Sequence, residues 1–297
     1  MDHSQRLNRS AGIAAVAVAA TLVVLKLWAF VQTGSLTIAA ALADSAVDML
    51  ISGAGLAAIV YAARPADEDH TFGHTSVEDL VSLAQAIFVT GSALAIGYGA
   101  VHRLISPAPR QLADEGTGIA IMLASAVLTG ALVLWQRRVA RLTGNRVVAA
   151  DMVHYLGDLL PTLGAIIALG LSAQYGIGQA DSILALIAAA FMLRAALNIG
   201  LGAWHALMDR AADPEIVEGI AGIAAGWPGV HGFHDLQTRT AGSRIFVNLH
   251  IELDGAQSLQ EAHAIGASLK RAITQRYPLA DVIIHKDVWH GSGTGPG

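Results

Sequence analysis

Residues 37–62 read TIAAALADSAVDMLISGAGLAAIVYA, an apolar run in which the charged side chains are those of Asp44 and Asp48. A helix that spans a bilayer needs about 20 mostly apolar residues, and this run is long enough. A charged side chain at the bilayer centre costs about 2.5–3.5 kcal/mol on insertion scales and is functional by default. The run therefore predicts a transmembrane helix with a functional site, whose two carboxylates lie one turn apart on one face.

Similar apolar runs recur along the first two thirds of the chain. The predicted transmembrane helices cover 11–31, 37–62, 80–105, 117–136, 148–173 and 181–207. The first run is too long for the apolar core of a signal peptide, so we interpret it as a membrane helix. Charged residues make up 14% of the chain, against roughly a quarter in soluble domains. A soluble protein with buried helices is the weaker alternative.

Charge and cysteine content exclude several classes of function. The net charge of -5 gives no basic face for nucleic acid, and the absence of cysteine excludes disulfides and thiolate metal sites. Arginines gather on one side of the predicted helices: Arg6, Arg9, Arg64, Arg137, Arg138, Arg141, Arg146 and Arg210. The other side has only Arg103 and Arg110. Since cytoplasmic loops carry the excess of arginine and lysine, both termini are predicted to be cytoplasmic.

The sequence after Asp209 has the pattern of a small soluble domain. Asp213 and Ser258 are predicted to cap two helices, the second with Glu261 completing a capping box. The predicted elements are helix 214–226, strands 234–240 and 244–253 around a turn at 241–243, a helix to 276 and strand 281–285. The predicted domains are a six-helix bundle over 1–210, a cytoplasmic αββαβ open sandwich of the α+β class over 211–290, and a disordered tail over 291–297.

A second pair of ligand-type residues matches the first. His154 and Asp158 have the same i, i+4 spacing in the fifth predicted helix. With Asp44 and Asp48 they make a set of three oxygens and one nitrogen, which suits a tetrahedral divalent ion, zinc above all, with Cd²⁺ or Fe²⁺ as alternatives. The plainer interpretation is a single buried aspartate that caps a broken helix or pairs with Lys26. Asp151 is interpreted as a charge at the start of its helix.

This pattern resembles the transport site of the cation diffusion facilitator family, and specifically its bacterial zinc and ferrous-iron efflux branch. The resemblance extends from Leu25 to about Asp287 and includes these segments: Thr33-Gly34-Ser35, Arg64-Pro65-Ala66-Asp67, Asp151-Met152-Val153-His154-Tyr155, Trp227-Pro228-Gly229-Val230, His234-Asp235-Leu236 and Val282-Ile283-Ile284-His285. It implies a homodimer in the inner membrane, a metallochaperone-like cytoplasmic domain and exchange of metal for protons.

The resemblance also implies two further metal sites. One is in the loop after the second helix, where Asp67, His70 and His74 match the family's ligands; the acidic, histidine-rich loop supports this site, with a plain solvated loop as the alternative. The other is in the cytoplasmic domain and comprises His234, His250, His263, His285 and Asp287, with Asp287 bridging two ions. His234 and His250 are expected side by side across the hairpin. The chain departs from its relatives at Thr75 and Ser76, where Gly-Lys is common.

The expected function is therefore export of a divalent metal by a metal/proton antiporter, not an enzyme activity. His154 is the expected coupling residue, because an imidazole must be neutral to bind metal and titrates near ambient pH. The alternatives are a related transporter for another ion, a membrane-anchored metal sensor and an intramembrane metallohydrolase, for which the chain lacks a His-Glu-x-x-His run.

Overall fold

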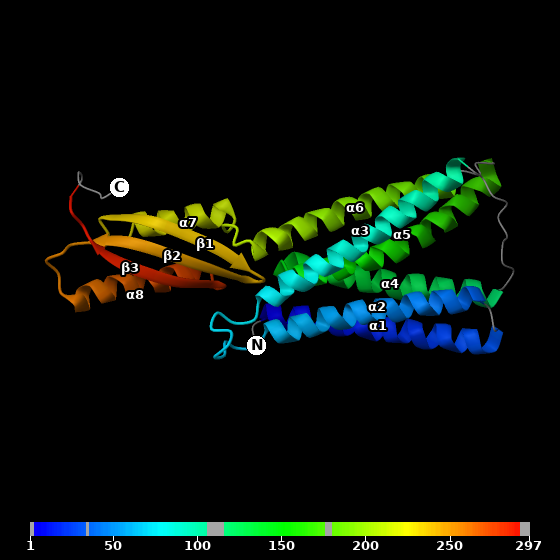
Figure 1. Ribbon diagram of the computed structural model, residues 1–297, viewed down its shortest axis with the longest axis horizontal. Coiled ribbons are helices and arrows are strands. Elements are labelled where there is room, and N and C mark those ends of the chain that lie inside the picture. Colours follow the sequence, from blue (N-terminus) through cyan, green and yellow to red (C-terminus); the bar gives the residue numbers. More distant parts are fainter. Residues whose placement is uncertain (1–2, 34–35, 106–115, 176–179, 292–297) are drawn as a thin grey trace. The chain divides into compact units, whose positions relative to one another are not determined.

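The computed structural model describes residues 3–33, 36–105, 116–175 and 180–291. The chain divides into two compact units, Met1–Trp204 and His205–Gly297 (Figure 1). The tail predicted to be disordered lies, apart from Gly291, outside the described residues.

The first unit is a bundle of long helices, as predicted. They are α1 (His3–Thr33), α2 (Leu36–Ala62), α3 (Ser76–Ile105), α4 (Gly116–Thr143), α5 (Arg146–Tyr175) and α6 (Ala180–Leu207). Among the described residues, four stretches are long and apolar enough to cross a membrane: His3–Gln32, Asp44–Ala62, Ser76–Ile105 and Ser182–Leu207. Several helices extend beyond the predicted spans, because polar residues continue a helix once it has left the apolar layer.

Helix α5 contacts every other helix of the bundle. It packs mainly against α3 and α4 and makes smaller contacts with α2 and α1. Val153 of α5 joins Val89 of α3 and Met192 of α6 in one buried cluster. Small residues allow this close packing, since they let helix backbones approach one another in a membrane bundle; Ala11 and Ala15 of α1 are fully buried. Side chains on α5 are therefore held from several sides.

The second unit has the predicted αββαβ order. Its elements are α7 (Pro214–Ala225), β1 (Gly232–Ala241), β2 (Arg244–Leu253), α8 (Leu259–Arg276) and β3 (Ala280–Val288). The sheet order is β1-β2-β3, with an antiparallel β1–β2 pair and a parallel β2–β3 pair. Gly242, at φ 55°, makes the predicted hairpin turn. Asp213 and Ser258 cap the two helices, and Glu261 completes the capping box.

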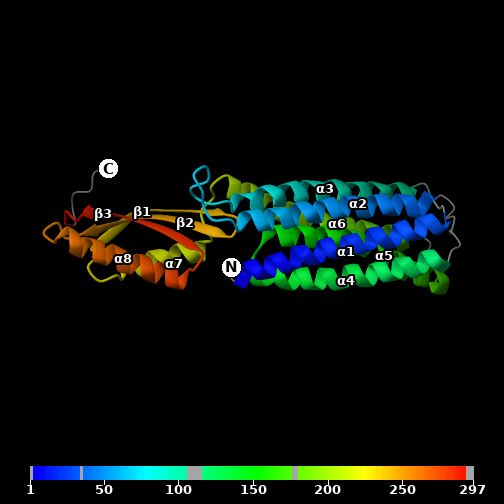
Figure 2. The same cartoon turned by 90° about the horizontal axis from the view of Figure 1, so that it is seen from below.

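Both helices of this unit cover the same face of the sheet (Figure 2). The core lies between them and includes Leu249 and Ile251 of β2, Ile220 of α7 and Ile273 of α8, all buried. Successive side chains of a strand point to opposite faces. His250, between Leu249 and Ile251, therefore points away from the helices, onto the uncovered face of the sheet.

Candidate metal centres

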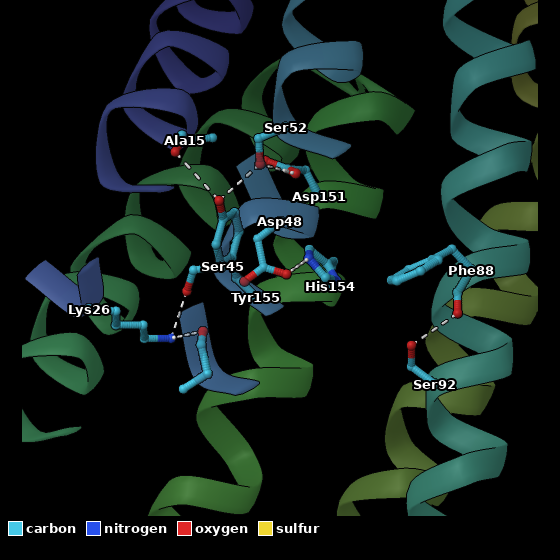
Figure 3. A network of polar contacts seen from close by, with 11 residues as sticks. Ala15, Lys26, Ser45, Asp48, Ser52, Phe88, Ser92, Asp151, His154 and Tyr155 are labelled. Carbon is cyan, nitrogen blue, oxygen red and sulfur yellow. Dashed lines mark hydrogen bonds and ion pairs between the residues drawn. The ribbon is translucent and has the colours of Figure 1, made fainter. Parts of the chain in front are cut away.

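The first candidate centre lies inside the bundle and joins α2 to α5. His154 Nε2 is 3.0 Å from Asp48 Oδ1 (Figure 3). Asp48, His154 and Asp158 each offer one ligand atom, and these atoms all lie within 4.8 Å of one another. His154 is buried, and the edge of the Phe88 ring of α3 packs against its imidazole. Two carboxylates and one imidazole in a membrane bundle are a donor set that suits a borderline divalent ion.

Asp44, the fourth predicted ligand, lies outside this group. Its side chain is exposed, one turn before Asp48 on α2. The same spacing of four residues brings His154 and Asp158 into one group but leaves Asp44 outside it. The spacing therefore predicts that two side chains share a helix face, and not that both reach the same point. Lys26 donates to Ser45 Oγ at 2.6 Å and to the carbonyl oxygen of Ala41 at 3.1 Å.

Asp151 corrects one prediction from the sequence. It was expected to be a charge at the start of its helix, yet it is buried in the bundle. Ser52 Oγ donates to its Oδ1 at 2.9 Å, and Gln136 Nε2 donates to its Oδ2 at 2.6 Å (Figure 3 shows Ser52). Because α5 already begins at Arg146, Asp151 lies more than one turn inside the helix and reaches α2 and α4. Ser52 and Gln136 are each one of several polar residues in their apolar runs, so the sequence did not indicate this contact.

The second candidate centre is the loop between α2 and α3. Asp67 Oδ1 accepts from the backbone N–H of His70 at 2.7 Å, and Asp67 Oδ2 is 3.2 Å from His74 Nε2. The hydrogen bond from His70 lowers the pKa of Asp67 below its ordinary value, so the carboxylate is charged at neutral pH. His74 is buried, and its Nδ1 has no hydrogen-bond partner in the described part of the chain. The three ligand atoms lie within 4.8 Å of one another and fit a divalent ion.

The third candidate centre lies on the uncovered face of the sheet in the second unit. His234, His250 and His285 are register partners across β1, β2 and β3, so the expected pairing across the hairpin is confirmed. Asp287 Oδ2 lies 2.9 Å from His250 Nδ1 and 3.4 Å from His234 Nε2. Its other oxygen, Oδ1, lies 3.2 Å from His285 Nε2. The two oxygens of one carboxylate thus face different imidazoles, as a bridging ligand does.

Asp287 belongs to this third centre as a charged carboxylate, whereas His263 lies away from it. Partial desolvation acts to raise the pKa of Asp287, but the hydrogen bond from His250 and the nearby imidazoles lower it overall. His263, which was predicted to contribute, is exposed on α8. Because α8 covers the opposite face of the sheet, one chain does not bring His263 to Asp287.

Comparison with known proteins agrees with this architecture. Residues 12–208 match the cation efflux transmembrane domain, and residues 212–288 match the cytoplasmic domain of cation efflux proteins. The cation-efflux pump FieF of Klebsiella pneumoniae is 42% identical over 282 residues, 95% of this chain and 93% of that protein. FieF of Escherichia coli O127:H6 is 41% identical over the same shares.

Solved structures match the cytoplasmic part of the chain. A structure of CzrB in its Zn form is 32% identical, covers 30% of this chain and all of that chain, and has a TM-score of 0.27. The metal-bound C-terminal domain of the CzcD transporter from Thermotoga maritima is 25% identical over 27% of this chain and 93% of that chain, with a TM-score of 0.25. With both domain matches and relatives that share almost their whole length with it, the chain belongs to the cation diffusion facilitator family of cation-efflux proteins.

Proposed function

We propose that the chain exports a divalent transition-metal cation across a membrane, with Zn²⁺ as the substrate, Fe²⁺ or Cd²⁺ as alternatives, and protons as counter-ions. The observation that carries the proposal is the convergence of Asp48, His154 and Asp158 inside the bundle. An intramembrane carboxylate is costly and marks an ion pathway. Relatives named cation-efflux pumps, at 41–42% identity, support the direction of transport.

The contact between Asp48 and His154 suggests how metal and proton exchange. A protonated His154 donates to Asp48, and both groups are then occupied without metal. A metal ion needs the neutral imidazole and both carboxylates, so its binding expels the proton. Asp44, one turn away, is the fourth ligand that we assign to the loaded site. Rocking of the bundle then exposes the site to the other side, as in other secondary transporters.

The other two centres serve the same cation in a different role. We assign Asp67, His70 and His74 to a loop site, and His234, His250, His285 and Asp287 to a cytoplasmic site that responds to metal and stabilises a homodimer. Carboxylates and imidazoles suit zinc in both places. The arginine distribution favours cytoplasmic termini, and the likeness to bacterial cation-efflux pumps favours the inner membrane.

Metal-driven proton flux into proteoliposomes tests the proposed function. Wild type and Asp48→Ala are compared with Zn²⁺, Cd²⁺, Mn²⁺ and, without oxygen, Fe²⁺. We expect zinc-dependent flux that falls to the level of empty liposomes in Asp48→Ala. The matched control is Glu218→Ala, which removes an exposed carboxylate on α7 and should leave the flux unchanged.

Two results would count against the proposal. Absence of flux for every ion in well-folded wild type would exclude the transporter and favour a membrane-anchored metal sensor. Full flux in Asp48→Ala would place the pathway elsewhere in the bundle. The order of the four ions identifies the substrate class.

A further inference from the structure

Asp151 lies at the centre of a buried polar cluster that connects four helices. We call this cluster the Asp151 junction: Asp151 and Tyr155 of α5, Ser52 of α2, Gln136 of α4 and the carbonyl oxygen of Ala15 in α1 (Figure 3 shows all but Gln136). The Tyr155 hydroxyl lies 2.9 Å from Ser52 Oγ and 3.4 Å from the Ala15 oxygen. Ser52 gives its one proton to Asp151, so the single proton of Tyr155 goes either to Ser52 Oγ or to the Ala15 oxygen.

The junction lies one helical turn from the candidate transport site. Ser52 follows Asp48 by four residues on α2, and Asp151 precedes His154 by three on α5. Since α2 and α5 make both the Asp48–His154 and the Ser52–Asp151 contact, they run antiparallel, and the two contacts are neighbours along the helices. The same pair of helices that supplies the metal ligands is therefore connected a second time.

The second connection matters most when a metal ion is bound. Metal binding replaces the hydrogen bond between Asp48 and His154, because both groups then face the ion. Without that bond, the relative position of α2 and α5 depends on the remaining contacts. A buried carboxylate strongly requires its donors, since an unpaired buried charge is costly. Asp151 therefore holds Ser52 and Gln136 in place whether or not metal is present.

We propose that Asp151 is a positioning residue, which keeps α2 and α5 in register through Ser52 and Gln136 so that Asp48, His154 and Asp158 converge on the cation. This inference rests on the proposed transport function. The role is geometric, and Asp151 itself does not touch the ion. Removal of the junction should loosen the ligand set, and so weaken metal binding and the preference for zinc.

Three variants separate hydrogen bonding from charge. Asp151→Asn keeps the shape of the side chain, and its amide nitrogen can donate to Gln136 Oε1, which has no hydrogen-bond partner in the described part of the chain. Asp151→Ala removes all the contacts, and Ser52→Ala removes only the contact to α2. Ser92→Ala is the control, since the Ser92 hydroxyl bonds only to the Phe88 carbonyl of its own helix in Figure 3.

In measurements of zinc-driven flux, loss of the junction should change the KM for zinc much more than the maximal rate. We expect Ser52→Ala and Asp151→Ala to raise the KM for zinc about tenfold, with a maximal rate within about threefold of wild type and a weaker preference for zinc over cadmium. Asp151→Asn should rescue the KM to within about threefold of wild type, and Ser92→Ala should match wild type. Zinc affinity can also be measured by equilibrium dialysis of the detergent-solubilised full chain. His70→Ala and Asp287→Ala are added in every variant to weaken the other two centres. The variants should rank by zinc affinity as they do by KM.

The outcomes that overturn the inference are specific. An unchanged KM in Ser52→Ala would show that the hydrogen bonds do not position the ligands. The same would follow if the KM of Asp151→Asn were as high as that of Asp151→Ala. Loss of thermal stability with an unchanged KM would assign the junction to folding alone. If wild type moves no ion, the proposed function fails, and the zinc dialysis then decides the inference by itself.

Discussion

The Nδ1 atom of His250 lies 2.9 Å from Oδ2 of Asp287, so neighbouring strands of the cytoplasmic sheet present an imidazole and a carboxylate to the same point. His250 is directly opposite His285 on β3, and the two rings have centroids 4.6 Å apart. Asp287 follows His285 by two residues and lies on the same sheet face, so its contact with His250 is diagonal. This offset leaves both oxygens of the carboxylate available to imidazoles.

Replacement of Asp287 by alanine should remove zinc from the cytoplasmic centre. The three imidazoles would lose the one anion that they share, and a divalent ion would lose its charge complement. Zinc titration of the full chain by calorimetry should show loss of the corresponding binding step or an affinity at least about tenfold lower. Asp281→Ala is the control, because Asp281 lies on the same strand away from the histidines; equal losses in the two variants would contradict the assignment.

Replacement of His74 by alanine should weaken zinc binding by the loop between α2 and α3. His74 Nε2 faces Asp67 from a buried position, so alanine removes a ligand whose orientation is already fixed. We expect one fewer zinc ion per chain by metal analysis after dialysis. The control is His102→Ala, near the end of α3; unchanged zinc content in His74→Ala would exclude this loop as a site.

Replacement of Gly157 by alanine should disturb the contact between α5 and α6. A Cβ atom at this position would overlap the terminal methyl of Met192, which is buried. Overpacking of a core typically costs about 1–3 kcal/mol, and we expect the lower end of that range because the methyl is the far end of a flexible side chain. Thermal unfolding in detergent should therefore show a lower midpoint for Gly157→Ala.

A second substitution tests the cause of that loss. Met192→Ala in the Gly157→Ala background should recover part of the midpoint, because it vacates the space that the new methyl needs. Gly91→Ala is the control, since nothing lies within 4 Å of a Cβ there. Strictly additive effects of the two substitutions would contradict the steric explanation.

Truncation of Ile273 to alanine should destabilise the cytoplasmic unit by about 2–5 kcal/mol, the usual range for a buried isoleucine. Ile273 is fully buried between α8 and the sheet. Urea unfolding of a fragment covering 205–297, which has its own core, measures the loss. Thr274→Ala, at an exposed neighbouring position, should change the stability by no more than about 0.5 kcal/mol.

The capping box of α8 should make the stability of the same fragment depend on pH. The backbone N–H and hydroxyl of Ser258 lower the pKa of Glu261 below its ordinary value of 4.5. A lowered folded-state pKa stabilises the fold above the ordinary value, and the stabilisation is lost as pH falls through the folded value. Wild type should therefore unfold at higher urea than Glu261→Gln at neutral pH, and the two midpoints should converge between about pH 5 and pH 3. A gap that stays constant with pH would contradict this.

The sequence was sufficient to predict contacts that follow from helical spacing or from a short turn. The helical spacings on α2 and α5 predicted that Asp48, His154 and Asp158 converge, although not that Asp44 stays outside their group. The short turn at Gly242 predicted that His234 and His250 are neighbours. The sequence was insufficient where a partner comes from a distant helix. Ser52 and Gln136 are each one of several polar residues in their apolar runs, and nothing local indicates that both point at Asp151. Similarly, α8 could present His263 to either side, and only the packed unit shows that it points away from the histidines.

The topology of the cytoplasmic sheet has a consequence for the order of its folding. The β1–β2 hairpin is closed by a short turn and can form early, whereas β3 reaches its parallel place beside β2 only after α8 has crossed over. Contacts between residues distant in sequence form slowly, because they require loop closure first. We therefore expect His234 and His250 to pair before Asp287 arrives. A zinc ion that requires all three residues would bind only the finished fold, and so would slow unfolding by holding the last strand in place.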